Sequence, residues 1–217
     1  SLVIAIPSAV GVFAWIATIW DGRPWYPAAM KFLVGFILLF VIGGVSGVMT
    51  AAVPFDWQLT DSYFIVAHLH SVLVGINVFP VIAGVYSWFP KLPGRLMNER
   101  LGSWNFWMMF VGMNVLFFPM HIVGLLGMPR RVYTYPSGLG WDIYNLIETV
   151  GAFIFAAGVL LFAINVWRSR TRGKAAGANP WDCATLEWSV PSSPPPCHFE
   201  PIPHVADRHP PRSKRLD

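Results

Sequence analysis

The chain has 217 residues, of which 55% are hydrophobic and 12% are charged. A soluble domain carries roughly twice that share of charged residues, so the composition excludes an ordinary soluble enzyme and indicates a protein embedded in lipid. The formal net charge of +4 does not indicate a nucleic-acid-binding protein, because most basic residues lie beside apolar stretches or in the C-terminal tail.

Five apolar stretches are each long enough to cross the hydrocarbon core of a membrane, which takes about 20 helical residues. They cover residues 2–20, 27–53, 62–89, 104–126 and 143–167. The sequence therefore predicts an all-α integral membrane fold with five transmembrane helices. Because the chain starts at Ser1, without a methionine and directly in an apolar stretch, we expect it to be part of a longer protein.

The distribution of Lys and Arg predicts which loops lie on the same side of the membrane. We expect 21–26, 90–103 and 168–174 on the inner, cytoplasmic side, and 54–61 and 127–142 on the outer side. Arg130 and Arg131 break the rule, because they would lie outside. This arginine pair needs an explanation other than membrane orientation.

Residues 169–217 differ in composition from the rest of the chain. Closely spaced prolines, among them Pro194, Pro195 and Pro196, interrupt any helical or strand period. We therefore divide the chain into a transmembrane part, residues 1–168, and an extended Pro-rich tail on the inner side, residues 169–217.

Two histidines, His68 and His70, lie well inside the third apolar stretch. Residues two apart on an α-helix differ by about 200° in azimuth, so the two imidazoles are predicted to point to opposite sides of the helix. Chelation of one metal favours histidines four residues apart, whereas this spacing suits two separate cofactors. The alternative is that each imidazole hydrogen-bonds the backbone or a serine of a neighbouring helix. Because ionisable groups in lipid are rare, the pair favours function.

Charged residues on the outer side are further candidates. A planar guanidinium binds both oxygens of a carboxylate, so Arg130 and Arg131 are candidate ligands of haem propionates; the alternative is lipid or solvent contact. Asp56 and Asp61 precede the histidine helix and are candidates for binding a hard cation, ordering water or hydrogen-bonding a propionate. The alternative for both acids is simple solvation.

Two other ionisable residues lie in the apolar stretches. Glu148 is close to the outer boundary of the fifth stretch, where we expect it to snorkel to the interface rather than to relay protons. His121 follows Pro119, whose missing N–H frees a carbonyl, and we expect that carbonyl to be a structural partner of the imidazole.

These residues belong to a longer pattern. The segment 56–70, Asp-Trp-Gln-Leu-Thr-Asp-Ser-Tyr-Phe-Ile-Val-Ala-His-Leu-His, resembles the signature segment of haem-copper oxidase subunit I, in which a helix begins Asp-Thr-Tyr-Tyr/Phe-Val-Val-Ala-His-Phe-His-Tyr. Further motifs that are similar to this family lie at residues 6–8, 13–15, 117–121, 127–131, 186–188 and 199–203. The chain resembles the C-terminal portion of such a cytochrome c oxidase subunit.

The resemblance implies a role for individual residues. His68 would be the proximal ligand of a high-spin haem, and His70 would be one axial ligand of a low-spin haem. Arg130 and Arg131 would bind haem propionates, and Asp61 matches an acid beside the family's magnesium site.

The chain also departs from the family pattern at several positions. Thr60 stands where the family has a magnesium-binding histidine, which weakens the magnesium assignment. Leu69 replaces an aromatic residue between the two histidines, and Ser71 replaces a tyrosine. Gly11 stands where many members have a lysine of a proton channel, although Ser8 keeps a neighbouring hydroxyl and is the candidate for a proton path.

For the whole subunit, the resemblance implies twelve helices, of which this chain would contain the eighth to the twelfth. With two haems and a copper ion, copper B, the enzyme would reduce oxygen to water with proton uptake in a bacterial inner membrane. The copper ligands are expected upstream of Ser1, so this fragment alone would be inactive. Expected partners are the missing N-terminal part, subunits II and III, and cytochrome c or quinol as electron donor. The alternative is an inactive scaffold or transporter-like relic of the family that binds no haem.

Overall fold

The five apolar stretches form long helices that stand side by side. In the computed structural model, which describes residues 2–20, 22–183 and 185–194, all five are long and apolar enough to cross a membrane, and no strand occurs within those residues. The helices are η1 (Leu2–Ile4), α1 (Ala5–Trp20), α2 (Ala28–Ala51), α3 (Val53–Leu59), α4 (Tyr63–His70), η2 (Ser71–Val78), α5 (Phe79–Trp88), η3 (Phe89–Lys91), α6 (Glu99–Leu125), α7 (Asp142–Arg172) and η4 (Leu186–Trp188). The prediction of an all-α membrane fold is confirmed.

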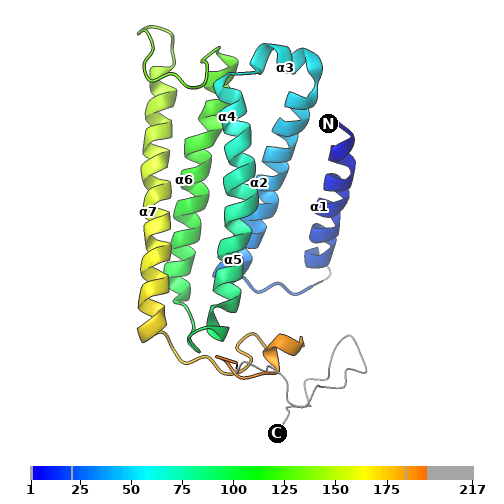
Figure 1. Ribbon diagram of the computed structural model, residues 1–217, viewed down its shortest axis with the longest axis vertical. Helices are drawn as coiled ribbons and strands as arrows, with labels where there is room; N and C mark the ends of the chain where they lie inside the picture. The colour runs from blue at the N-terminus through cyan, green and yellow to red at the C-terminus, as the bar shows by residue number, and fades with distance from the viewer. Residues whose placement is uncertain (1, 21, 184, 195–217) are drawn as a thin grey trace.

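The loops group at the two ends of the bundle as the charge pattern predicts. Helix α3 and the α6–α7 loop lie at one end, which we call the outer end (Figure 1). Residues 22–27 between α1 and α2, the α5–α6 connection, and residues 173–183 and 185–194 lie at the other end, which we call the inner end.

Helices α6 and α7 make the most extensive contact in the bundle, and their backbones approach closely. A Cβ at Gly112 would lie 2.5 Å from the backbone nitrogen of Phe155, and a Cβ at Gly151 would lie 2.4 Å from that of Leu116. Helix association in lipid depends on close packing because no hydrophobic force drives it, and glycine allows the backbones to touch. These two glycines therefore set the distance between α6 and α7.

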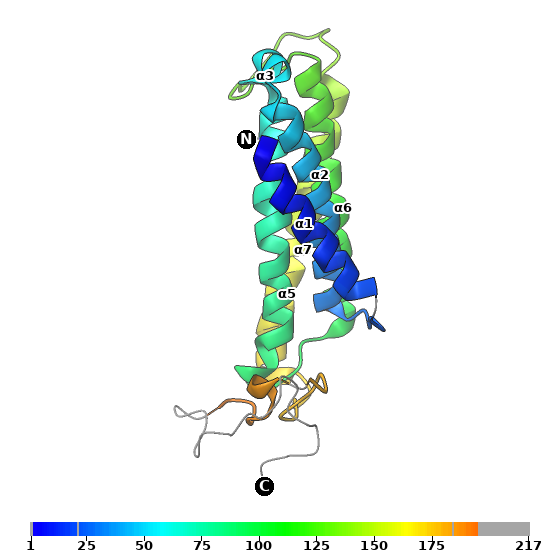
Figure 2. The ribbon, with the colours of Figure 1, turned by 90° about the vertical axis from the view of Figure 1, so that its right-hand side faces the viewer.

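Aromatic side chains fill the space between α2, α5 and α6. Phe32 and Phe79 are fully buried, with ring centroids 5.3 Å apart, and Phe106 packs on both. Helix α1 stands apart from this core and has no buried residue. Trp15 contacts Phe36 and Phe40 of α2, and α1 crosses α2 at an angle (Figure 2).

A buried polar network joins α5, α6 and α7 near the inner end. Asn105 and Asn165 are both fully buried, and Tyr86 lies between them. The Tyr86 hydroxyl donates to Asn105 Oδ1 and accepts from Asn165 Nδ2, both at 3.1 Å. Asn105 Nδ2 also donates to the Gly158 carbonyl at 2.9 Å. Because each amide finds partners inside the bundle, these polar groups can be buried in a membrane domain.

Residues 173–183 and 185–194 fold back onto the inner loop, whereas the proline pattern predicts an extended tail. Helix α7 continues to Arg172, and the backbone then pairs with the 91–98 segment: Leu96 N–H donates to the Lys174 carbonyl (2.8 Å) and Ala176 N–H to the Gly94 carbonyl (2.9 Å). Lys91 Nζ donates to the carbonyls of Ala178 and Val190. The rest of the predicted tail, 195–217, lies outside the described residues.

The third span is not a uniform α-helix. Residues Ser71–Val78 form a π-helix, η2, directly after His70. Pro80 stands at the start of α5 and cannot donate to the carbonyl four residues before it, so a wider turn at this point relieves the mismatch. Single π turns within α-helices are frequent at functional sites.

Candidate functional site

Helix α4 begins at a well-defined cap that sets the positions of His68 and His70. Ser62 is the N-cap: its hydroxyl accepts from Phe64 N–H (3.3 Å) and donates to the Leu59 carbonyl (2.6 Å). Asp61, just before it, has a φ of 62°, which reverses the chain between α3 and α4. The rotation of both imidazoles about the helix axis therefore depends on this turn.

His68 faces α2. Its Nδ1 lies 3.0 Å from the Ser46 hydroxyl, which itself donates to the Gly43 carbonyl at 3.0 Å. Since that hydroxyl has one proton, it must accept from Nδ1–H of His68. A Cβ at Gly47 would lie 2.8 Å from Cε1 of the ring, so α2 accommodates the imidazole because residue 47 has no side chain.

His70 faces α6, on the other side of α4. Its ring stacks on Phe117, with centroids 4.9 Å apart and an interplanar angle of 20°. Its Nδ1 lies 2.8 Å from the Val66 carbonyl. A carbonyl can only accept, so Nδ1 carries the proton in this contact.

The two histidines thus share one arrangement on opposite faces of one helix. In each, Nδ1 is the donor, which leaves Nε2 with its lone pair in the neutral imidazole, and no hydrogen bond to either Nε2 is found within the described residues. A histidine with a purely structural role would also form the hydrogen bond to Ser46. That bond occupies only Nδ1, however, and leaves Nε2 of His68 without a partner among the residues that the structure describes. A free Nε2 with Nδ1–H held by a serine or a carbonyl is the donor set that fits an axial ligand of haem iron.

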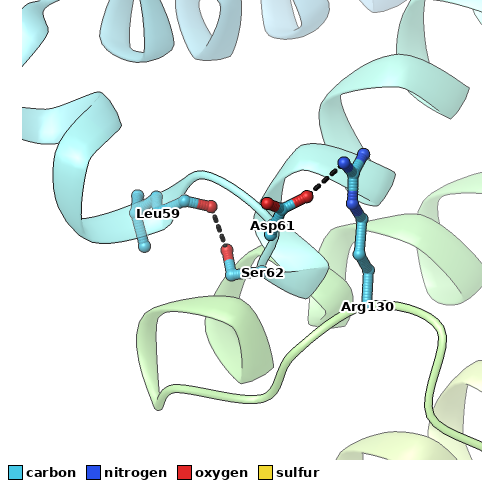
Figure 3. Close-up of polar contacts among 4 residues, drawn as sticks. All are labelled: Leu59, Asp61, Ser62 and Arg130. Atoms are coloured by element: carbon cyan, nitrogen blue, oxygen red, sulfur yellow. Dashed lines mark hydrogen bonds and ion pairs between the residues drawn. The ribbon is translucent and has the colours of Figure 1, made fainter.

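Asp61 and Arg130 join the start of α4 to the end of α6 at the outer end. The two side chains form an ion pair, with the guanidinium of Arg130 directed at the carboxylate (Figure 3). The backbones are also joined: Arg130 N–H donates to the Asp61 carbonyl and Tyr63 N–H to the Met128 carbonyl, both at 2.9 Å. We call these contacts the outer clamp.

The outer clamp leaves donors of the arginine pair available. Arg130 Nε is buried and has no hydrogen-bond partner in the described part of the chain. Arg131 follows with an exposed side chain and a φ of 68°, so the backbone turns at this residue. An orphaned guanidinium N–H and a neighbouring cation fit the carboxylates of haem propionates. Asp56 lies in the first turn of α3, and its side chain forms no hydrogen bond or ion pair within the described residues.

The predicted magnesium ligand, Asp61, and the predicted proton-path residue, Ser8, are both engaged in contacts within the chain. Within the described residues, no group of three or more His, Cys, Asp or Glu side chains could hold a metal ion, and Asp61 is engaged with Arg130. This arrangement does not support a magnesium ion at Asp61. The Ser8 hydroxyl donates to the Ile4 carbonyl of its own helix at 3.0 Å.

Glu148 and His121 differ from the sequence-based expectations. Glu148 is only 4% exposed, and its Oε1 has no partner among the described residues, so the expected snorkelling is wrong. It faces the interior of the bundle, close to Tyr63 and Tyr135. Both His121 nitrogens are buried without a hydrogen bond in the described chain, so the carbonyl freed by Pro119 is not used. The 3.6-residue period of α7 could have placed Glu148 inward, three residues before the buried Gly151.

The pKa of one outer loop residue is shifted. Tyr135 packs against Trp141, with ring centroids 5.6 Å apart. Loss of solvent, followed by the nearby carboxylate of Asp142, raises the pKa of the Tyr135 phenol. The Tyr135 phenol is therefore a weaker acid than a fully solvated tyrosine.

Comparisons with known proteins identify the family to which the chain is related. Residues 1–154 match the family described as Cytochrome C and Quinol oxidase polypeptide I. The fold is shared with a cryo-EM structure of a heme-copper terminal oxidase dimer, at a TM-score of 0.61 and 21% sequence identity over 68% of this chain and 27% of that one.

Curated relatives are more similar in sequence. Cytochrome c oxidase subunit 1 of Bacillus subtilis is 47% identical over 94% of this chain and 33% of its own length. The subunit 1 of a Synechocystis strain is 44% identical over 94% of this chain and 36% of its own length. The chain therefore spans about a third of these relatives. From the family match over residues 1–154, the chain belongs to the cytochrome c and quinol oxidase polypeptide I family.

Proposed function

We propose that this chain is the haem-ligating part of a respiratory terminal oxidase that reduces oxygen to water, coupled to proton uptake or translocation. The observation that carries the proposal is the pair His68 and His70, whose rings face different helices and whose Nε2 atoms make no hydrogen bond in the described chain. Membership of the family supports the proposal.

His68 and His70 have separate roles in this proposal. His68 is the proximal ligand of a high-spin haem, and His70 is an axial ligand of a low-spin haem. When bound, the two haems supply electron transfer and oxygen binding. The chain orients the ligands: Ser46 holds the imidazole of His68, and the Val66 carbonyl holds that of His70. Such outer contacts fix the tautomer and increase the basicity of the ligating nitrogen.

The outer arginines bind the propionates. Arg130 offers its unpaired Nε–H, and Arg131 offers a second cation next to it. The positive charge of this pair lowers the cost of burying propionates at the membrane surface. Asp56 is a candidate for a further hydrogen bond to a propionate.

The metal and proton roles rest partly on residues outside this chain. Copper B would be held by the remaining two thirds of the subunit, and the fragment alone would be inactive. Ser8 could pass a proton only after its hydroxyl leaves the Ile4 carbonyl, and Gly11 supplies no ionisable group. A proton route along α1 would therefore need ordered water.

The proposed partners follow from membership of the oxidase family. They are the N-terminal part of subunit I, subunits II and III, and cytochrome c or a quinol as electron donor. The inner end of the bundle, including residues 173–194, would face the cytoplasm of a bacterium.

Replacing each histidine in the full-length oxidase tests the proposal. His68→Ala should abolish carbon monoxide binding at the high-spin haem, whereas His70→Ala should disturb the low-spin spectrum, because each removes one iron ligand. Optical and magnetic spectra of the purified complexes measure both effects. Loss of one and the same signal in both variants would contradict the two-haem assignment, and a wild-type complex without haem would favour the inactive scaffold.

A further inference from the structure

A cavity of about 440 Å³ lies at the inner end of α6 and α7, outside the haem-ligand site. Its walls include Met97 just before α6, Glu99 at the start of α6, Arg168 and Arg172 near the end of α7, and Lys174 just beyond. The volume lies within the usual range of small-ligand sites. His68 and His70 belong to α4, which begins at the opposite end of the bundle (Figure 1).

The cavity carries excess positive charge. Arg168 and Arg172 are four residues apart and so lie on the same face of α7. The single carboxylate in the wall belongs to Glu99, whose Oε2 accepts from the Ala28 N–H at 2.7 Å. Within the described residues, no carboxylate forms an ion pair with Arg168, Arg172 or Lys174. The positive charges of these three side chains are therefore not neutralised by a described carboxylate, and they can pair with an anionic ligand.

The cavity lies where phospholipid headgroups would be. Trp104 and Trp167 flank the inner ends of α6 and α7 and are 62% and 78% exposed. Exposed tryptophans near the ends of spans mark the membrane–water interface. Leu96 and Met97 give the cavity an apolar wall, so it offers both a charged and an apolar surface to one ligand.

We propose that this cavity binds an anionic phospholipid of the inner leaflet. The headgroup phosphate pairs with Arg168 and Arg172, and Lys174 adds a third positive charge. Basic pockets between spans on the inner side have the chemistry of lipid-phosphate sites, and a guanidinium binds two phosphate oxygens at once. This proposal does not depend on haem binding.

The test uses the full-length oxidase complex in nanodiscs of phosphatidylcholine with a small fraction of phosphatidylglycerol. The double variant Arg168→Gln/Arg172→Gln should retain phosphatidylglycerol about 30-fold more weakly, as measured by mass spectrometry after mild delipidation. The matched control is Arg170→Gln, because Arg170 lies between the two and does not line the cavity. It should retain the lipid like the wild type. Arg168→Lys/Arg172→Lys should restore most of the binding.

Three outcomes would overturn the proposal. One is equal retention of phosphatidylglycerol in the glutamine double variant, the control and the wild type. Another is that inorganic phosphate, added to the complex in pure phosphatidylcholine, raises its unfolding temperature as much as phosphatidylglycerol does. That result would assign the site to the free ion. The third is loss of another subunit from the double variant with lipid retention unchanged, which would assign the cavity to a protein contact.

Discussion

Ser46 links the candidate haem ligand His68 to α2 through a hydroxyl that both accepts and donates. Its bond to Nδ1 stops the ring from rotating, and its bond to the Gly43 carbonyl fixes the hydroxyl itself. A ligand held in this way loses little freedom when iron binds Nε2.

Removal of that hydroxyl should weaken haem retention. In Ser46→Ala, the imidazole of His68 is free to rotate, so we expect the high-spin haem to dissociate about tenfold faster or more. The iron–histidine stretching frequency in resonance Raman spectra should fall. Thr50→Ala is the matched control, because Thr50 lies one turn further along α2 and donates only to the Gly47 carbonyl. A Ser46→Ala spectrum identical to that of the control would show that the bond does not orient the ligand.

The outer clamp should affect haem potential in two opposite directions. Arg130→Gln removes a positive neighbour, which favours the oxidised iron and lowers the midpoint potential. Asp61→Asn removes the negative partner of Arg130 and should raise the potential. Redox titration of each full-length variant measures the shift, with Arg100→Gln at the inner end as a control. Shifts of the same sign in both clamp variants would rule out an electrostatic role.

Helices α6 and α7 show how a pair of spans depends on single glycines. Gly112→Val would place side-chain atoms where the backbone of Phe155 lies, since even a Cβ would be 2.5 Å away. We expect a loss of about 3 kcal/mol of stability, measured as a lower unfolding temperature in detergent. Gly44→Ala is the control, because nothing lies within 4 Å of that position. Equal unfolding temperatures in the two variants would mean that the helices can separate without cost.

The helices themselves could be predicted from the sequence, but their ends less well. Hydropathy marks only the part of a helix that lies in lipid, so it predicts the fourth span from residue 104, whereas α6 begins at Glu99. Asn98 caps it by accepting from Leu101 N–H at 3.0 Å, a local signal that a search for apolar residues ignores. The polar composition of residues 54–61 predicts a loop there, but residues Val53–Leu59 form α3, in which Pro54 favours the first turn. The π-helix after His70 has no sequence signal beyond Pro80.

Only the features of the site that lie within one helix could be predicted from the sequence. The opposite faces of His68 and His70 follow from helix geometry and two residue numbers. The Asp61–Arg130 pair joins residues far apart in sequence, so no local period contains it. The identities of Ser46 and Phe117 as neighbours of the two rings likewise depend on how the spans pack.

On the scale of the whole molecule, residues 173–183 and 185–194 cover the inner end of the third span. Lys91 holds them by bonds to two carbonyls and lies 4.9 Å from the ring centroid of the buried Trp188. Because a single side chain joins so many parts of this segment, its loss should release the segment from the bundle.

Lys91→Met should make residues 173–194 sensitive to protease. The variant loses the charge and both hydrogen bonds, so cleavage in this segment should increase several-fold in inside-out vesicles and not in right-side-out ones. Lys31→Met is the control, since Lys31 lies at the same end but donates to Ser103 of α6. Cleavage only in right-side-out vesicles would reverse the proposed orientation.

The third span has one rigid end and one adjustable end. The outer clamp fixes the height and rotation of Tyr63, and every α-helical residue after it adds about 100° of rotation. Deleting one residue between Tyr63 and His68 would therefore turn both imidazoles away from α2 and α6. Deleting one residue from Ser71–Val78 could instead be absorbed by converting a wide turn to an α-helical one, below the histidines. The span thus tolerates a change of length on one side of its ligands and forbids it on the other.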